Sequence, residues 1–291
     1  MRITQGMNQR HVLADLQRVQ ERLSQAQSQV SSGKRVEKPS DDPLAAARAT
    51  RLQADLDATD AFRTTVEESK SWLDASDAAL TSLTSVVQRV RELTVQGANG
   101  ATSDAARQSI KSQVDQLIEQ AKSTLNGAYD GRYLFSGTAT DQPPYTTATG
   151  DAYQGDANPV LRQIGPGVTV QVNVTADDAL STLLPALRTL STHLGANDVA
   201  SLGTSDLAAL DAGLDNVVGL QSKVGAITNR VTAAGSRLAD LNDVTTILLS
   251  NTQDADLPKA LTDLSAQQTA LQAALRGGAS LIQQSLMDFL Q

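Results

Sequence analysis

The sequence predicts a mainly α-helical fold. We expect an elongated helical rod whose coiled-coil N- and C-terminal helices pair together, with a small β-rich insert domain in the middle of the chain. Three observations predict it. Hydrophobic residues at both ends of the 291-residue chain recur in alternating steps of four and three, which draws a stripe down one side of a helix. Long stretches on either side of the middle lack proline. Residues 127–167, by contrast, are crowded with glycine and proline and lead into a strand-like alternation.

The two terminal stripes form the candidate working surface of the protein. Each stripe is too narrow for a globular core and suits one or two partner helices. The chain is therefore expected to begin and end with coiled-coil assembly helices, within residues 1–42 and 250–291. The residues of this assembly seam are Val12, Leu16, Val19, Leu23, Val30, Leu257, Leu261, Leu264, Leu271, Leu275, Ile282 and Phe289.

A loop interrupts the first helix at residues 31–43, where glycine and proline occur close together. Asp42 is expected to cap the next helix, with Pro43 in its first turn, where the missing N–H costs nothing. The proline-free stretch that follows predicts one long helix over about 43–96. A glycine-rich loop then predicts an antiparallel helix that ends near residue 128.

Residues 131–180 are expected to form the β-rich insert, with four or five short strands. Valine alternates with polar residues over 168–174, which is the period of a half-exposed strand. Helical spacing returns after the insert, and a capping sequence at 204–206 precedes a second long helix. The helical rod is thus assigned to residues 43–130 and 181–249.

The insert and its entrance also hold a cluster of aromatic residues, which include all four tyrosines of the chain. The cluster comprises Tyr129, Tyr133, Phe135, Tyr145 and Tyr153. Aromatic side chains bury large areas per residue, so they suit the core of a short β domain. The alternative is an exposed face that binds carbohydrate, and of the two the core interpretation is favoured.

The composition argues against several classes of function. The formal net charge is −8, and the charges are evenly mixed. This argues against nucleic acid, which requires clustered Lys and Arg, and against anionic membrane surfaces. No apolar run is long enough for a transmembrane helix, and the start lacks the apolar stretch of a cleaved signal peptide. Cysteine is absent, so no disulfide or thiolate metal site is expected.

The search for catalytic, cofactor-binding or metal-binding residues is nearly empty, and none is expected. His11 and His193 lie far apart in sequence and are interpreted as surface or boundary residues. Ser31 and Lys34 fit the Ser-x-x-Lys pattern of serine acyltransferases, but the companion motifs Ser-Asp-Asn and Lys-Thr-Gly do not occur. This stretch is better explained as a loop between two helices.

The terminal helices are expected to be marginal when isolated. Ordering the backbone costs roughly 1–2 kcal/mol of free energy per residue. Burying one stripe and forming the helix hydrogen bonds together stabilise the segment by no more than this cost. A terminal helix that packs between the terminal helices of neighbouring copies of the chain can bury more than one of its faces. We therefore expect the termini to become ordered only on assembly.

Five segments resemble the flagellin superfamily. They are residues 31–36 (Ser-Ser-Gly-Lys-Arg-Val), 39–46 (Pro-Ser-Asp-Asp-Pro-Leu-Ala-Ala), 131–137 (Gly-Arg-Tyr-Leu-Phe-Ser-Gly), 266–273 and 285–290. The proline-flanked second segment and the third are more similar to the hook–filament junction group than to filament-forming flagellins.

The resemblance implies a structural component of the bacterial flagellum, an adaptor at the hook–filament junction. It implies export through the flagellar secretion channel, without a cleaved signal peptide, to the cell exterior. The implied partners are copies of the chain in a ring, a hook-side junction protein, flagellin, and an export chaperone. Three alternatives stay open: a filament-forming flagellin, a cytosolic coiled-coil scaffold, and a hydrolase that uses Ser31 and Lys34.

Overall fold

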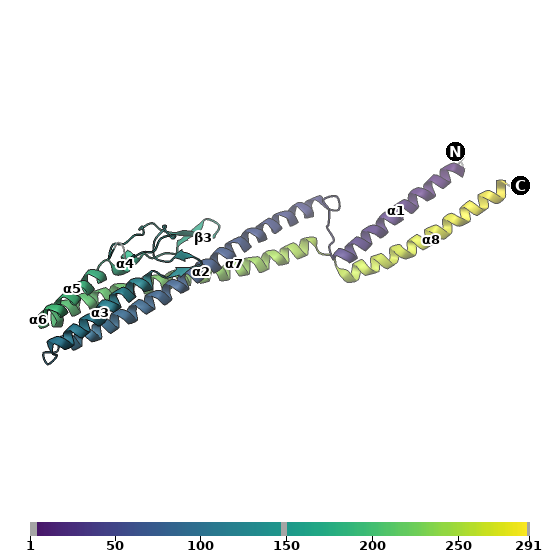
Figure 1. Ribbon diagram of the computed structural model, residues 1–291. Helices are drawn as coiled ribbons and strands as arrows, with labels where there is room; N and C mark the ends of the chain where they lie inside the picture. The colour runs from purple at the N-terminus through teal and green to yellow at the C-terminus, as the bar shows by residue number, and fades with distance from the viewer. Residues whose placement is uncertain (1–4, 147–149, 290–291) are drawn as a thin grey trace. The chain divides into compact units, whose positions relative to one another are not determined.

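The computed structural model describes residues 5–146 and 150–289, with side chains described at Met7, 10–146 and 150–279. Long helices dominate it, and short antiparallel strands occur only in the middle of the described chain (Figure 1). The mainly α-helical class with a small β-rich insert is therefore confirmed.

The chain divides into two compact units. The terminal unit combines Met1–Ala58 with Leu241–Gln291, and the central unit is Thr59–Asp240. The two longest helices, α2 (Pro43–Gly97) and α7 (Leu207–Gln253), contribute residues to both units.

The helices of the central unit largely follow the predicted bounds. α2 ends at Gly97, within one residue of the prediction. Ser103 caps α3 (Asp104–Leu125), because its hydroxyl accepts a hydrogen bond from the Ala106 N–H at 3.3 Å. α3 ends at Leu125, earlier than the predicted residue 128, since the chain turns at Asn126 into the first strand.

A short helical series connects the insert to α7. It comprises α4 (Ala176–Leu180), α5 (Leu183–Ala196), α6 (Val199–Ser201) and a π-helical turn, η1 (Leu202–Asp206). The predicted capping sequence at 204–206 is part of this π-helical turn. His193, expected to be a surface or boundary residue, is partly exposed, and its Nδ1 lies 2.8 Å from the carboxylate of the buried Asp206.

The insert contains two antiparallel hairpins within the described residues. The first joins β1 (Ala128–Tyr129) to β2 (Arg132–Tyr133), and the second joins β3 (Leu161–Gly165) to β4 (Val168–Gln171). The second turn contains Gly167 at φ +68°, a conformation that favours glycine. The predicted strand over 168–174 is confirmed in its first half, and its later residues leave the sheet.

The aromatic residues of the insert do not build a separate core. Phe135 and Tyr145 are buried in the same hydrophobic cluster as the helices, whereas Tyr129 is 39% exposed and lies outside that cluster. The shared core is built from Leu80, Leu83 and Val90 of α2, Val114 and Ile118 of α3, Leu187 and Leu190 of α5, and Val217, Val224 and Val231 of α7. The insert is thus part of the central unit and depends on its helices.

A charged network also ties the insert to these helices. The Arg188 guanidinium of α5 donates hydrogen bonds to Asp151 of the insert at 2.7 and 2.8 Å and to Glu119 of α3 at 2.8 Å. The ammonium group of Lys122, a largely buried side chain of α3, donates to Asp151 at 3.2 Å. Hydrogen bonds from Arg188 in particular lower the pKa of the Asp151 carboxyl from 3.8 to about 2.

The terminal unit is organised around one pair of helices. α1 (Gln5–Ser32) and α8 (Leu257–Phe289) lie side by side and run antiparallel, so their outer ends lie together (Figure 1). The prediction that the first and last helices pair is confirmed.

Candidate functional site: the paired terminal helices

The predicted stripe of α1 lies toward α8. Its positions are buried or partly buried, whereas every other residue from 10 to 27 is exposed. The positions are Val12, Leu16, Val19, Leu23, Ala26 and Val30. Val12 lies beside Gly278 of α8, where an added Cβ would come 3.3 Å from the Val12 Cγ1. Small residues therefore let the two helices approach closely at this point.

α8 presents a partly different face from the one predicted. Between residues 257 and 279 the side that is not exposed consists of Ala260, Leu264, Gln267, Leu271, Ala274 and Gly278. This series also alternates steps of four and three, and it includes Leu264 and Leu271 of the predicted seam. The hydrophobic pattern missed Ala260, Gln267 and Ala274, because short or polar residues give a weak signal against larger neighbours.

The other predicted positions of α8 are on its uncovered side. Leu257, Leu261 and Leu275 are exposed by 48, 52 and 52%. Leu261 and Leu275 are two seven-residue steps apart, so they lie in one column along the helix. Ile282 and Phe289, the last two predicted positions, lie outside the described side chains. α8 thus carries a wider apolar stripe than one partner helix covers.

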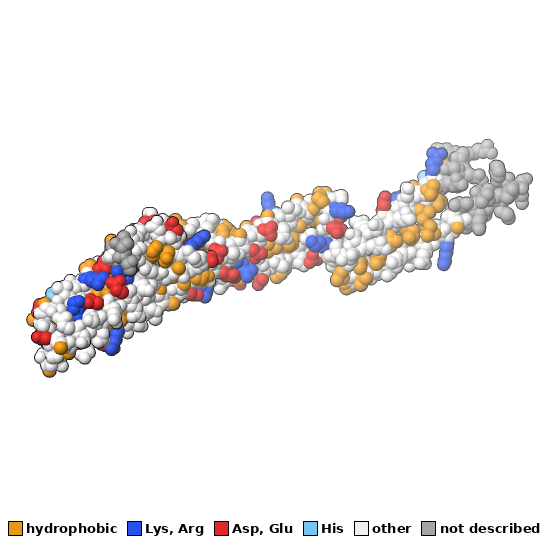
Figure 2. Space-filling model, in the orientation of Figure 1, with side chains coloured by type: hydrophobic (Ala, Val, Ile, Leu, Met, Phe, Trp, Pro, Cys, Tyr) orange, Lys and Arg blue, Asp and Glu red, His pale blue; other side chains and the backbone are white. Residues whose placement is uncertain are grey.

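A second exposed apolar strip occurs on the end of α7 within the terminal unit. Leu241, Val244, Ile247 and Leu248 are all largely exposed, whereas Thr245 is buried. Figure 2 shows hydrophobic side chains gathered on the visible surface of this unit. The spacing of three and four places these residues on one side of α7.

A short backbone joint holds the loop after α1 against the loop before α8. The Arg35 N–H donates to the Gln253 carbonyl at 2.7 Å, and the Ala255 N–H donates to the Gly33 carbonyl at 2.8 Å. Gly33 has φ +70°, which permits this close turn, and Val36 is buried beneath it. The sequence predicted the loop but not this pairing, because its partners are more than 200 residues apart.

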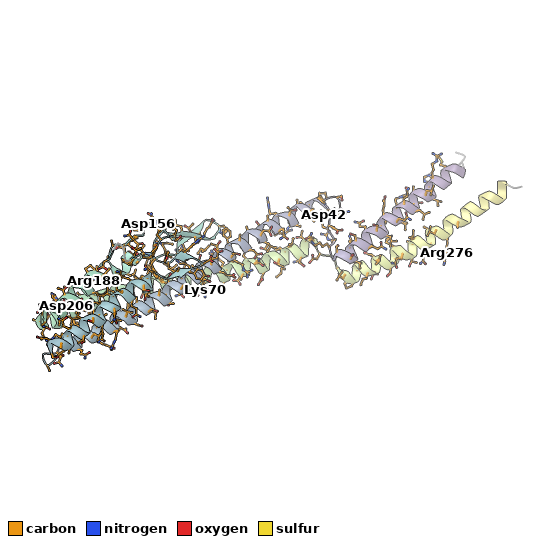
Figure 3. The ribbon with its side chains drawn as sticks, viewed as in Figure 1. Asp42, Lys70, Asp156, Arg188, Asp206 and Arg276 are labelled. Carbon is orange, nitrogen blue, oxygen red and sulfur yellow. The ribbon has the colours of Figure 1, made fainter. Side chains whose placement is uncertain are left out.

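The carboxylates of the same loop organise the start of α2. Asp42 caps α2 as predicted, since it accepts a hydrogen bond from the Ala45 N–H at 3.0 Å (Asp42 is labelled in Figure 3). This bond, helped by the Arg35 guanidinium 3.6 Å away, holds the pKa of the Asp42 carboxyl below its usual value. Asp41 accepts hydrogen bonds from the backbone of residues 37 and 38.

The polar groups singled out in the sequence do not converge on one another. Ser31 and Lys34 are exposed at the end of α1 and in its loop, and His11 is exposed on α1. Among the described residues, no group of three or more His, Asp or Glu side chains is placed to share a metal ion. Within the same described chain, no helix combines the length and apolarity needed to cross a bilayer.

Two family profiles match this chain, one at each end. The bacterial flagellin N-terminal helical region matches residues 3–140, and the bacterial flagellin C-terminal helical region matches residues 207–290. Together they include both terminal helices, the joint, and the long helices α2 and α7.

Individual relatives cover nearly the full length. Flagellar hook-associated protein 3 of Salmonella typhimurium is 26% identical, and the match covers 95% of each chain. Flagellin of Bacillus subtilis is 25% identical over 84% of each chain. The solved structure of FlgL from Bacillus cereus has a TM-score of 0.61 at 23% identity and covers 69% of this chain and 99% of its own. That structure supports the fold.

Proposed function

Because the chain belongs to the flagellin superfamily of structural flagellar proteins, we propose that it is the adaptor at the hook–filament junction. One observation carries this proposal: the match to flagellar hook-associated protein 3 extends over 95% of both chains. The family makes the protein a component of the flagellum that associates with other flagellar components. An enzymatic activity is not typical of such a family, and the proposed role requires none.

The assembly surface in this proposal is the seam of α1 and α8. Val12, Leu16, Val19, Leu23 and Val30 pair the helices with the help of Leu264 and Leu271. The uncovered residues Leu257, Leu261 and Leu275 contact neighbouring copies in a ring. The sequence spacing of seven from Leu275 assigns Ile282 and Phe289 to the same surface. We keep the three-part division (1–42 with 250–291, 43–130 with 181–249, and 131–180) as part of the proposal.

The remaining partners follow from the same role. A junction adaptor contacts a hook-side junction protein on one side and flagellin on the other. We propose that the chain reaches the cell exterior through the flagellar secretion channel, without a cleaved signal peptide, after binding an export chaperone. The half-covered seam suits this route, because helices that bury little surface are easily unfolded for transit.

The proposal includes terminal helices that become ordered only on assembly. Amide hydrogen exchange of the dilute full-length protein tests this step. Amides of residues 12–30 and 257–279 are expected to exchange rapidly while those in the central core are protected. Strong protection of both terminal segments in the monomer would contradict it.

Gene deletion separates the junction role from that of a filament flagellin, which the match to Bacillus subtilis flagellin keeps as a second candidate. Loss of a junction adaptor leaves hooks without filaments and sheds monomeric flagellin into the medium. Loss of a flagellin leaves the junction in place and no flagellin in the medium. Electron microscopy and immunoblots of the medium distinguish the two.

A further inference from the structure

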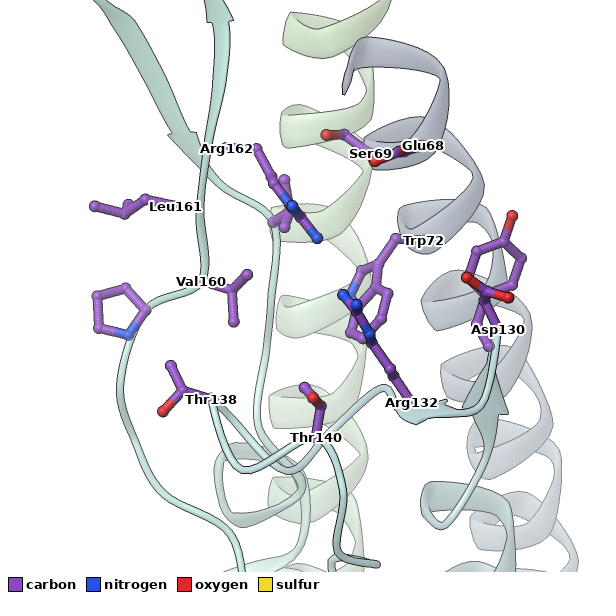
Figure 4. Close-up of a pocket in the computed structure, with 13 residues that line it drawn as sticks. Glu68, Ser69, Trp72, Asp130, Arg132, Thr138, Thr140, Val160, Leu161 and Arg162 are labelled. Carbon is purple, nitrogen blue, oxygen red and sulfur yellow. The ribbon is translucent and has the colours of Figure 1, made fainter. Parts of the chain in front are cut away.

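A groove of about 620 Å³ opens in the central unit beside the entrance to the insert (Figure 4). Its walls come from α2, from the first hairpin and the loop after it, from the start of β3 with the two residues before it, and from Val172 after β4. Its polar and aromatic lining residues include Glu68, Trp72, Tyr129, Arg132, Thr138 and Arg162. Seam residues of the terminal helices take no part in it.

An aromatic surface forms one side of the groove. Tyr129 is 39% exposed, and its ring stands edge-to-face against Trp72, with the centroids 6.5 Å apart at an angle of 83°. Trp72 is only 8% exposed, so it supports the tyrosine ring from below. The Trp72 Nε1 is buried and has no hydrogen-bond acceptor among the described residues, which is unusual for an indole.

Two arginines face this aromatic pair. Figure 4 shows the labelled side chains of Arg132 and Arg162 reaching toward Trp72 from two different segments. In the described part of the chain neither guanidinium forms an ion pair, whereas Arg91 and Arg188 are both paired with carboxylates. Each guanidinium carries a planar fork of N–H donors that matches a carboxylate.

Hydroxyl-binding groups complete the lining. Glu68 and Asp130 are carboxylates of the groove wall, and no ion pair joins either of them to an arginine among the described residues. Thr138 and Thr140 add two hydroxyls. Carboxylates accept hydrogen bonds from ligand hydroxyls. The Thr138 hydroxyl already donates to Asp156, so it offers a ligand only an acceptor, whereas a threonine hydroxyl such as that of Thr140 can both donate and accept.

We propose that this groove binds an acidic saccharide. Its carboxylate pairs with Arg132 and Arg162, the C–H face of its ring stacks on Tyr129, and its hydroxyls bond to Glu68 and the threonines. The combination favours a sugar over an acidic peptide, because a peptide lacks the ring face and the array of hydroxyls. This site is independent of the junction role, so either proposal can fail without the other.

Intrinsic fluorescence reads the site directly, because Trp72 is the only tryptophan of the chain. The full-length protein is titrated with a galacturonic acid trimer and with the matching neutral galactose trimer, and calorimetry checks the binding. A change in Trp72 emission is expected, with the acidic trimer bound at least about tenfold more tightly. No signal from either trimer up to about 10 mM, or equal affinity for both, would overturn the proposal.

Substitutions of the lining residues test whether the saccharide binds in this groove. Arg132→Gln and Arg162→Gln are each expected to weaken the acidic trimer about tenfold or more, and Tyr129→Ala to weaken both trimers. Arg89→Gln, an exposed arginine elsewhere on α2, is the matched control and should bind normally. If an Arg→Gln variant fails to fold, Arg132→Lys replaces it in the test. Lysine keeps the positive charge but lacks the planar pair of donors that binds a carboxylate at two points. A folded Arg132→Lys protein with wild-type affinity overturns the assignment.

A final titration distinguishes an acidic saccharide from an acidic peptide as the ligand. A hexa-aspartate peptide is titrated under the same conditions. Weak or absent binding of the peptide supports the saccharide. Peptide binding as tight as that of the acidic trimer, with the same loss in Arg132→Gln, would replace the saccharide by an acidic protein segment.

Discussion

The terminal helix pair and the core of the central unit are built on the same spacing of four and three, yet they bury it to different extents. Leu83 and Val90 of α2 are completely buried because α3, α5, α7 and the insert share one cluster with them. Leu16 and Val19 of α1 are only partly buried, since one helix, α8, packs along their stripe. The number of neighbours therefore decides whether a stripe becomes a core or an incomplete surface.

This difference explains why the two units suit different tasks. A stripe closed on all sides stabilises its own unit and leaves nothing for a partner. A stripe with one neighbour keeps apolar area exposed, and burying each further Å² of it contributes roughly 25 cal/mol on association. The seam of the terminal unit therefore still has association energy to gain from further neighbours.

The largest expected effect is in the closed core. Leu83→Ala should lower the free energy of unfolding of the central unit by about 2–5 kcal/mol, because it leaves a cavity at a fully buried site. Urea unfolding followed by Trp72 fluorescence measures it, since Trp72 lies in that unit. The matched change Leu16→Ala in α1 should leave this signal unaltered. Equal losses in both variants would erase the distinction between the units.

A charge in the open stripe should affect assembly rather than folding of the centre. Leu271→Asp places a carboxylate at a partly buried position between α8 and α1, and desolvating it unpaired costs several kcal/mol per copy. We expect loss of swimming with an unchanged Trp72 unfolding curve. Gln272→Asp, exposed on the same helix, is the control and should swim. Normal motility of the Leu271→Asp strain would show that assembly does not depend on the seam of α1 and α8.

A smaller effect is expected from the charged network of the central unit. The folded-state pKa of Asp151 is about 2 against 3.8 for an unperturbed carboxyl, so its stabilisation is present above about pH 4 and is lost as the pH falls toward 2. Asp151→Asn should cost at most about 1 kcal/mol at pH 7, since the pair is partly exposed.

The same substitution should flatten the acid limb of the stability curve between about pH 4 and 2. Asp141→Asn, an exposed aspartate of the same insert, is the control and should leave the curve unchanged. Unfolding by urea at several pH values measures both. An acid limb as steep in Asp151→Asn as in the parent protein would show that the network does not stabilise the insert.

The smallest effect is expected at two adjacent glycines of α8. Gly277→Ala should stabilise the helix by about 0.5–1 kcal/mol, because an added Cβ meets nothing within 4 Å. Gly278→Ala should gain less, since its Cβ comes 3.3 Å from Val12. Amide exchange along residues 264–276 in the assembled protein compares the two. A larger gain at Gly278 would mean that α1 does not press against this position.

Local sequence patterns are sufficient to predict much of the candidate site. They predict the stripe of α1, because apolar residues recur there in steps of four and three from Val12 to Val30. They also predict the Asp42 cap, since a helix start requires only the side chain and the next few N–H groups. The family resemblance likewise rests on contiguous segments.

Long-range packing decided the rest. Which face of α8 meets α1 depends on how close two backbones come, so Ala260 and Gly278 enter the contact while Leu261 and Leu275 remain outside. The joint between Arg35 and Gln253 and the pairing of His193 with Asp206 also depend on how separate segments approach each other in the folded chain. So does the meeting of Trp72 with Tyr129, Arg132 and Arg162.

The sequence by itself therefore determined the long helices, the Asp42 cap and the presence of a half-exposed stripe at each end. These features depend on residues within one or two helical turns, where spacing alone sets which side chains share a face. The tertiary structure decided which side of each stripe is covered and which polar groups converge. Those outcomes depend on contacts between distant segments, whose geometry is set by the packing of the whole unit.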